Sequence, residues 1–144
     1  MRDIPLTITK HLPEHTPALR RIFRDARRHA FTWEDPAQFD LMDFDLASKG
    51  EEILVAMENE TPIGFIAWWP PQNFVHSLFV DPASIGKGAG KQLLKACLEK
   101  MGRPASLKCL QANQNALAFY KAQGWEIQSA GETTDGAYYV LAVN

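Results

Sequence analysis

The chain has 144 residues, the length of one domain with a single hydrophobic core. Its composition, 46% hydrophobic and 22% charged, excludes collagen-like, coiled-coil and wholly disordered chains. No apolar run approaches the roughly 20 residues of a membrane-spanning helix, and the N-terminus lacks the apolar stretch of a secretory signal. With two cysteines and no zinc-like spacing of Cys and His, we expect one cytoplasmic domain over residues 1–144 with no metal and no membrane partner.

The net charge of −2 conceals an uneven distribution of charge along the chain. Residues 1–30 carry seven Lys and Arg against three acids, whereas residues 31–60 carry one Lys against nine acids. The arginines of the basic block lie on the polar side of a helical pattern: Arg20, Arg21, Arg24, Arg27 and Arg28. We interpret them as a solvated helix face, so no nucleic-acid partner is expected.

The first half of the chain predicts one strand, two helices and three further strands. Ile4 to Thr9 alternates in the manner of a short strand, and the apolar spacing from Pro13 to Ala30 is helical. Asp35-Pro36 is a good N-cap and first-turn pair, so a second helix is predicted from there toward Gly50. A hairpin and a third strand follow, over residues 52–58, 61–69 and 73–80.

The second half alternates between helix and strand. The apolar stripe from Leu93 to Met101 predicts a helix that ends at Gly102. The remaining elements are a strand, a short helix and a strand pair, over residues 106–111, 115–123, 125–129 and 137–143. This order predicts an α+β fold with a central, mixed, mostly antiparallel twisted sheet of about seven strands flanked by four helices.

The most informative segment runs from Leu78 to Lys91, where a strand passes through a turn into a glycine-rich loop that opens a helix. Unpaired backbone N–H groups and the helix dipole favour an anion such as a pyrophosphate there. The spacing fits neither common nucleotide loop. A P-loop would need Gly at Ile85 and Ser or Thr at Gln92, and a dinucleotide fingerprint would need Gly at Lys91.

Two motifs resemble those of a known family. Residues 80–90 (VDPASIGKGAG) resemble the acyl-CoA loop of the GNAT superfamily of N-acetyltransferases, whose pattern is Arg/Gln-x-x-Gly-x-Gly/Ala. Residues 113–125 (NQNALAFYKAQGW) resemble its Asn-x-x-Ala-x-x-Phe-Tyr-x-x-x-Gly-Phe/Trp motif. The chain is therefore identified as a small, bacterial-type member with the GNAT fold. Ile85 departs from the pattern, because the family usually has Arg or Gln there, and this removes a side-chain contact but leaves the backbone amides.

The resemblance implies that acetyl-CoA is the cosubstrate and that its acetyl group passes directly to a primary amine of a small molecule in a ternary complex. It also implies that Asn113 lies near the pantetheine arm, although the same residue fits the N-cap of the following helix. The amide of Leu78 is the candidate for polarising the thioester carbonyl. The remaining implied cofactor contacts are Val80, Gly86, Lys87, Gly88, Ala89, Gly90, Lys91 and Tyr120.

Tyr120 and His76 are the predicted catalytic residues. A thiol has an ordinary pKa near 8.5 and a phenol one near 10, so a positioned Tyr120 can protonate or hydrogen-bond the leaving sulfur, as the resemblance implies. An acceptor amine is mostly charged at pH 7 and needs a base, for which His76 is the candidate. Structural roles for both remain alternatives: an aromatic core residue and a structural strand histidine. Cys97 and Cys109 are expected to be buried, unreactive thiols.

The acceptor side is less determined. In the family the first two helices and their loop wall the acceptor pocket, and here Phe31 and Trp33 are the predicted substrate contacts. The same region is acidic. Its carboxylates would suit a cationic amine but would equally suit a solvated helix face; they are Glu34, Asp35, Asp40, Asp43 and Asp45. Four more aromatic residues either line the pocket or pack: Trp68, Trp69, Tyr138 and Tyr139.

Two other functions stay open on the sequence. One is acetyl transfer to a protein N-terminus, a lysine or an aminoacyl-tRNA. The other is an acyl-CoA-binding module that has lost its chemistry, for which Ile85 is the only support. Dimers are frequent in the family, so the resemblance also leaves a homodimer open.

Overall fold

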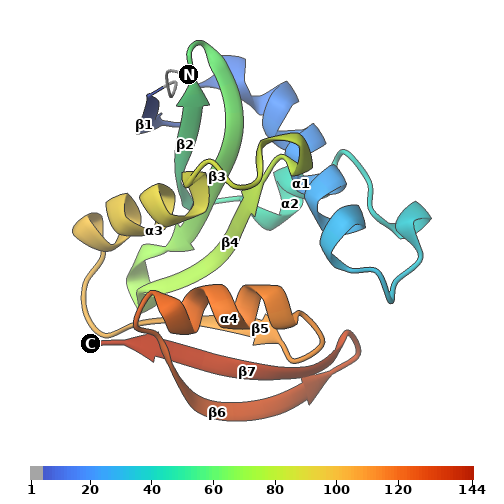
Figure 1. Cartoon of the computed structure of the whole chain (residues 1–144), viewed down its shortest axis with the longest axis vertical. Coiled ribbons are helices and arrows are strands. Elements are labelled where there is room, and N and C mark those ends of the chain that lie inside the picture. Colours follow the sequence, from blue (N-terminus) through green and yellow to red (C-terminus); the bar gives the residue numbers. More distant parts are fainter. Residues whose placement is uncertain (1–4) are drawn as a thin grey trace.

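The computed structural model describes residues 5–144, and Ile4 of the predicted first strand lies outside the described residues. Seven strands form one sheet in the order β1-β2-β3-β4-β5-β7-β6 (Figure 1). The strands are β1 Leu6–Lys10, β2 Glu52–Glu58, β3 Thr61–Trp69, β4 Phe74–Val80, β5 Ala105–Leu110, β6 Glu126–Thr133 and β7 Gly136–Val143. The α-helices are α1 Thr16–Ala30, α2 Asp43–Ala47, α3 Ala89–Lys100 and α4 Gln114–Ala122. The predicted α+β fold is confirmed.

The alternation of apolar residues on β3 builds a core on each face of the sheet, because successive strand residues point to opposite faces. Phe65 and Ala67 pack with residues of α1 and α2. Ile66 and Trp68 pack on the other side with residues of α3 and with Leu117 of α4. Within residues 5–144 no helix is both long enough and apolar enough to span a membrane.

The sheet opens between its two central strands. β4 and β5 run parallel, the one parallel pairing among the described strands, and they pair only at Phe74 with Ser106 and at Val75 with Leu107. β4 stays paired with β3 as far as Val80. Beyond Val75 the two central strands therefore separate (Figure 1), and the edge of β4 from His76 to Val80 faces a wedge.

The pairing of β3 with β4 contains a bulge at the same place. Ala67 pairs with Ser77 and Trp68 pairs with Val75, so the register passes over His76. An extra residue of this kind bends the strand and changes the direction of its side chain. His76 is therefore the bulged residue at the point where the wedge begins.

The predicted second helix, from Asp35 toward Gly50, is wrong as one continuous element. The structure has a 3₁₀ turn at Pro36–Gln38 and a separate short helix, α2, and Phe39 between them is extended. Two carboxylates explain the break: Asp35 accepts a hydrogen bond from the Ala37 N–H, and Asp43 accepts one from the Asp40 N–H. The Asp35 carboxylate thereby caps the 3₁₀ turn, and the Asp43 carboxylate fixes the backbone just before α2.

The oppositely charged segments of the chain meet across α1 and α2. Arg20 lies 2.7 Å from Asp45 and Arg27 lies 3.0 Å from Asp43. Arg28 donates to the carbonyls of Pro36 and Phe39. Three residues of the basic block, Arg20, Arg27 and Arg28, are thus not simply solvated: they bind α2 and the segment before it.

Candidate functional site

The glycine-rich loop before α3 has the backbone shape of an anion cradle. Gly86 and Gly88 have φ angles of +92° and +83°, which side-chain-bearing residues rarely adopt. Apart from each glycine and its two chain neighbours, no described residue has an atom within 4 Å of the point where a Cβ at Gly86 or Gly88 would stand. Gly88 is the N-cap of α3, and the N–H groups of the first helical turn have no acceptor within the helix. Such a site suits a phosphate or pyrophosphate.

The side chains of this loop hold it in place. Lys87 Nζ lies 3.0 and 2.9 Å from the two carboxylate oxygens of Glu58, at the end of β2. The Lys87 ammonium is thus paired with the Glu58 carboxylate, so the group of Lys87 that remains available to an anion is its backbone N–H. Ile85 is 59% exposed, so its side chain does not close the loop.

The two sequence motifs meet in the structure. A Cβ on Gly90 would stand 3.6 Å from the ring of Phe119, so the first turn of α3 lies close against α4. Asn113 Oδ1 accepts a hydrogen bond from the Ala116 N–H at 3.4 Å. The N-cap interpretation of Asn113 is confirmed, and its role toward CoA stays a prediction.

Tyr120 stands on α4 between aromatic rings and a thiol. Its ring centroid lies 5.3 Å from that of Phe119 and 6.1 Å from that of Trp125, both in edge-to-face geometry. Burial raises the pKa of the Tyr120 phenol above its ordinary value, and the neighbouring Cys109 thiol raises it further. The hydroxyl is therefore a neutral hydrogen-bond donor at physiological pH.

The two thiols are buried, as the sequence predicts. Burial raises the pKa of Cys97 to about 12 and that of Cys109 to about 11. Both therefore stay protonated at neutral pH, which makes them poor nucleophiles.

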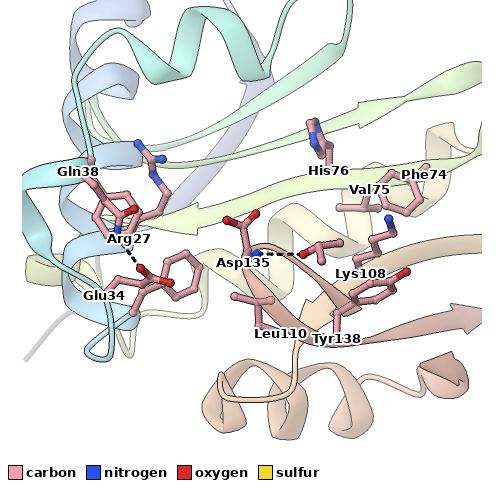
Figure 2. Close-up of a pocket in the computed structure, with 13 residues that line it drawn as sticks. Arg27, Glu34, Gln38, Phe74, Val75, His76, Lys108, Leu110, Asp135 and Tyr138 are labelled. Atoms are coloured by element: carbon pink, nitrogen blue, oxygen red, sulfur yellow. Dashed lines mark hydrogen bonds between the residues drawn. The ribbon is translucent and has the colours of Figure 1, made fainter. Parts of the chain in front are cut away.

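A cleft of about 550 Å³ opens where β4 and β5 begin to separate (Figure 2). It is lined by His76 and its neighbours on β4, by α1 and the segment after it, and by β5 with the β6–β7 hairpin. The lining residues are Arg27, Phe31, Glu34, Gln38, Phe39, Phe74, Val75, His76, Lys108, Leu110, Thr133, Asp135 and Tyr138.

The predicted acceptor aromatics divide between cleft, surface and core. Phe31 and Tyr138 line the cleft. Trp33 is 42% exposed and packs 5.4 Å from the ring of Phe31, outside the lining. The other three divide as follows: Trp68 is buried, Trp69 is exposed and Tyr139 packs against the core.

The cleft carries charges of both signs. The Lys108 ammonium lies 4.8 Å from the centre of the Tyr138 ring. Glu34 accepts a hydrogen bond from Gln38 at 2.7 Å. Asp135, at the turn between β6 and β7, points into the opening (Figure 2). Neither Lys108 nor Asp135 was predicted as a site residue, because nothing in the neighbouring sequence indicates the cleft.

Arg27 joins the wall of the cleft to the charge network of α1. Its guanidinium lies over the ring of Phe23, 3.7 Å from the centroid, and donates to Asp43. Burial lowers the pKa of Arg27, and the hydrogen bond to Asp43 opposes that shift. An arginine with an ordinary pKa above 12 stays charged all the same.

One contact was not foreseen. His76 Nδ1 lies 3.0 Å from Glu51 Oε2, and the Glu51 side chain is only 6% exposed. Burial raises the pKa of Glu51, while the adjacent imidazole acts in the opposite direction. Glu51 lies directly before β2 and His76 lies on β4, 25 residues further along the chain, so no sequence spacing pointed to the pair.

The chain belongs to the acetyltransferase (GNAT) family, whose family model matches residues 16–125. The apo-form solution structure of YjaB from Escherichia coli is similar, with a TM-score of 0.79 and 22% identity over 96% of this chain and 97% of that one. The ribosomal-protein-S18-alanine N-acetyltransferase from the same organism has a TM-score of 0.76 and 20% identity over 96% and 93%. The putative acetyltransferase yncA from Salmonella typhimurium, solved with acetyl-CoA, has a TM-score of 0.73 and 20% identity over the same shares.

Proposed function

We propose that the protein transfers the acetyl group of acetyl-CoA to a primary amine of a small molecule. The observation that carries this is the position of the glycine cradle, which follows directly from β4 at the end where β4 has left β5. A phosphate-bearing tail bound at the cradle can extend along the free edge of β4 toward Tyr120. The Salmonella structure with acetyl-CoA supports the choice of cosubstrate.

The backbone amides from Gly86 to Lys91 hold the CoA pyrophosphate in this proposal. Leu78 and Val80, on the free edge of β4, contact the pantetheine arm, and the Leu78 N–H polarises the thioester carbonyl. Asn113 contacts the same arm beside its capping role. Loss of the side-chain contact at Ile85 weakens binding, but the amides remain.

The reaction starts with loss of a proton from the acceptor ammonium to His76. The nitrogen lone pair then attacks the thioester carbon, so a C–N bond forms, and the C–S bond breaks with its electron pair on sulfur. The nitrogen loses a second proton, and the sulfur takes it up as the CoA thiol. The first proton leaves His76 to solvent.

Tyr120 assists the sulfur by hydrogen bonding. A thiol has an ordinary pKa near 8.5, and the pKa of the Tyr120 phenol is raised above 10 by burial. Full proton transfer from this phenol to a thiolate is therefore uphill, whereas a hydrogen bond to the departing sulfur stabilises its developing charge.

The cleft supports a small acceptor. Its volume of about 550 Å³ lies within the range of small-molecule sites, roughly 300 to 1,000 Å³. Its mixed charges suit an acceptor that is itself polar. A protein N-terminus, a lysine or an aminoacyl-tRNA remains the second candidate, for which the S18-alanine acetyltransferase offers a structural precedent at the level of the fold.

The first experiment measures the melting temperature with acetyl-CoA, CoA and ATP at equal concentration. A ligand at 100 times its Kd adds about 2.7 kcal/mol, which raises Tm by several degrees. We expect a rise with acetyl-CoA and CoA and none with ATP. An amine panel with thiol release as the readout then separates an enzyme from a binding module, and no Tm rise with either CoA form would reject the proposal.

A further inference from the structure

The bulge on β4 gives His76 a position that an ordinary strand residue would not have. The register passes from Val75 to Ser77, so His76 lies outside the regular alternation. It is 51% exposed and lines the cleft at the point where β4 and β5 separate (Figure 2). A histidine there can meet both the acceptor and solvent.

Glu51 reaches His76 across β3. Glu52 pairs with Trp68, and Trp68 pairs with Val75, so the start of β2 and the start of β4 lie in one row of the sheet. Glu51 lies directly before β2, one residue before this row, and His76 lies on β4 just after it. Gly50, with φ of +79°, lies in the turn directly before Glu51.

The environment of Glu51 is unfavourable for a carboxylate with only a structural role. Its side chain is 6% exposed, and Oε1 has no hydrogen-bond partner among residues 5–144. A buried ionised carboxylate with incomplete pairing destabilises a fold. The one described partner is the imidazole of His76 on Oε2.

We propose that Glu51 is a positioning residue for His76, through a contact at Nδ1 that leaves Nε2 as the nitrogen that takes the acceptor's proton. The carboxylate holds the ring in one orientation and compensates the positive charge that the ring gains in that step. The proposal rests on the function proposed above. It adds no co-reactant, because the proton moves from the acceptor nitrogen to Nε2 and then to solvent.

Other groups face His76 from the remaining walls of the cleft. They are Arg27 and Glu34 from α1 and the segment after it, Lys108 from β5, and Asp135 and Tyr138 from the β6–β7 hairpin. Glu51 differs from all of them in its 3.0 Å contact with a ring nitrogen of His76.

The decisive test does not require activity. Imidazole ¹⁵N spectra of the free protein report which nitrogen of His76 carries the proton at neutral pH. We expect the Nδ1–H form in the unmodified protein and a mixture in Glu51→Met, which keeps the volume but removes the acceptor. Glu52→Gln, exposed and one residue away, is the matched control and leaves the spectrum unchanged. An unchanged spectrum in Glu51→Met overturns the proposal, whatever the enzyme's substrate.

Steady-state kinetics with an amine that the enzyme acetylates provide a second test of the same proposal. Removing a group that orients a functional histidine commonly lowers activity by about 10- to 100-fold. We therefore expect Glu51→Met to lower kcat/KM by that factor and to leave the KM for acetyl-CoA unchanged. Glu51→Gln, which keeps an acceptor, should recover part of the loss. In a His76→Ala background Glu51→Met should cost nothing further, and additive losses would contradict a role through His76.

Melting temperatures separate positioning from folding. Because burial raises the pKa of Glu51, its ionised form at pH 7 costs stability, and the cost grows as pH rises through the interval between its unfolded and folded pKa values. Glu51→Gln should therefore keep or raise Tm at pH 7 while activity falls. A parallel loss of Tm and activity would assign Glu51 a structural role instead.

Discussion

The cradle before α3 and the cleft beside His76 are built in opposite ways. The cradle is a continuous stretch of chain whose shape is set by backbone conformation, through the positive φ angles at Gly86 and Gly88. The cleft is assembled from α1 and the segment after it, β4, β5 and the β6–β7 hairpin, and its surface is formed by side chains. A contiguous backbone motif can be recognised in a sequence, whereas a surface made by distant segments cannot.

The two regions also differ in electrostatics. At the cradle the attraction for an anion comes from N–H groups and the helix dipole, because Lys87 is paired with Glu58. In the cleft the electrostatic field comes instead from side-chain charges of both signs, including Lys108 and Asp135. The cradle is thus suited to one common anionic group, and the cleft is suited to selecting an acceptor.

The largest expected effect concerns the chemistry between the two regions. Tyr120→Phe keeps the ring packing and removes the hydroxyl, so kcat should fall by roughly 10²-fold or more while the Tm rise with CoA persists. Steady-state kinetics with thiol detection measure the loss. Tyr139→Phe, whose ring packs against the core, is the matched control, and equal effects of the two changes would remove Tyr120 from the mechanism.

The next effect tests the cradle alone. Gly86 and Gly124 share a φ of +92° with open space at the Cβ position, so Ala at either site carries similar strain of about 1–2 kcal/mol. Only Gly86→Ala puts a methyl group where the anion would lie. We expect at least about tenfold weaker CoA binding by calorimetry for Gly86→Ala and unchanged binding for Gly124→Ala. The same affinity in both variants would argue against the cradle.

A smaller effect tests the cleft alone. Lys108→Met removes a partly exposed charge, which is worth about 1 kcal/mol or less, so KM for the acceptor should change by a few-fold. The direction of the change in KM indicates the charge of the acceptor. A rise in KM indicates an acidic group on the acceptor, and a fall indicates an acceptor with excess positive charge. KM for acetyl-CoA should not move. An equal change in both KM values would show that the cleft and cradle are not separate.

The smallest effect concerns the segment that walls the cleft. The Asp40 N–H and the Arg27 guanidinium lower the pKa of Asp43 below its ordinary value of 3.8. Its contribution to stability is therefore present above about pH 4 and is lost as pH falls through the folded pKa. Asp43→Asn should reduce the drop in Tm between pH 7 and pH 3 by a degree or so, since the Asp43 carboxylate is partly exposed to solvent, which screens the pair. An unchanged drop would mean that the pair contributes nothing.

Features that depend on a few neighbouring residues were predictable from the sequence. The hairpin strands over residues 52–58 and 61–69 have the predicted bounds, and Asn113 caps α4 as its residue type suggests. The glycine loop and the motif over residues 113–125 identified the family, because backbone conformation and capping are local properties.

Tertiary structure decided the rest. The interrupted second helix follows from Phe39 turning toward the rings around Arg27 and from carboxylates that cap short turns. Phe31 lines the cleft while Trp33 lies outside it, although both fitted the same prediction. The pairing of Glu51 with His76 depends on the register of three strands and a bulge. The family and the glycine-rich loop could be read from the sequence alone, because both depend on short-range conformation. Packing between distant segments decided the cleft and the partner of His76.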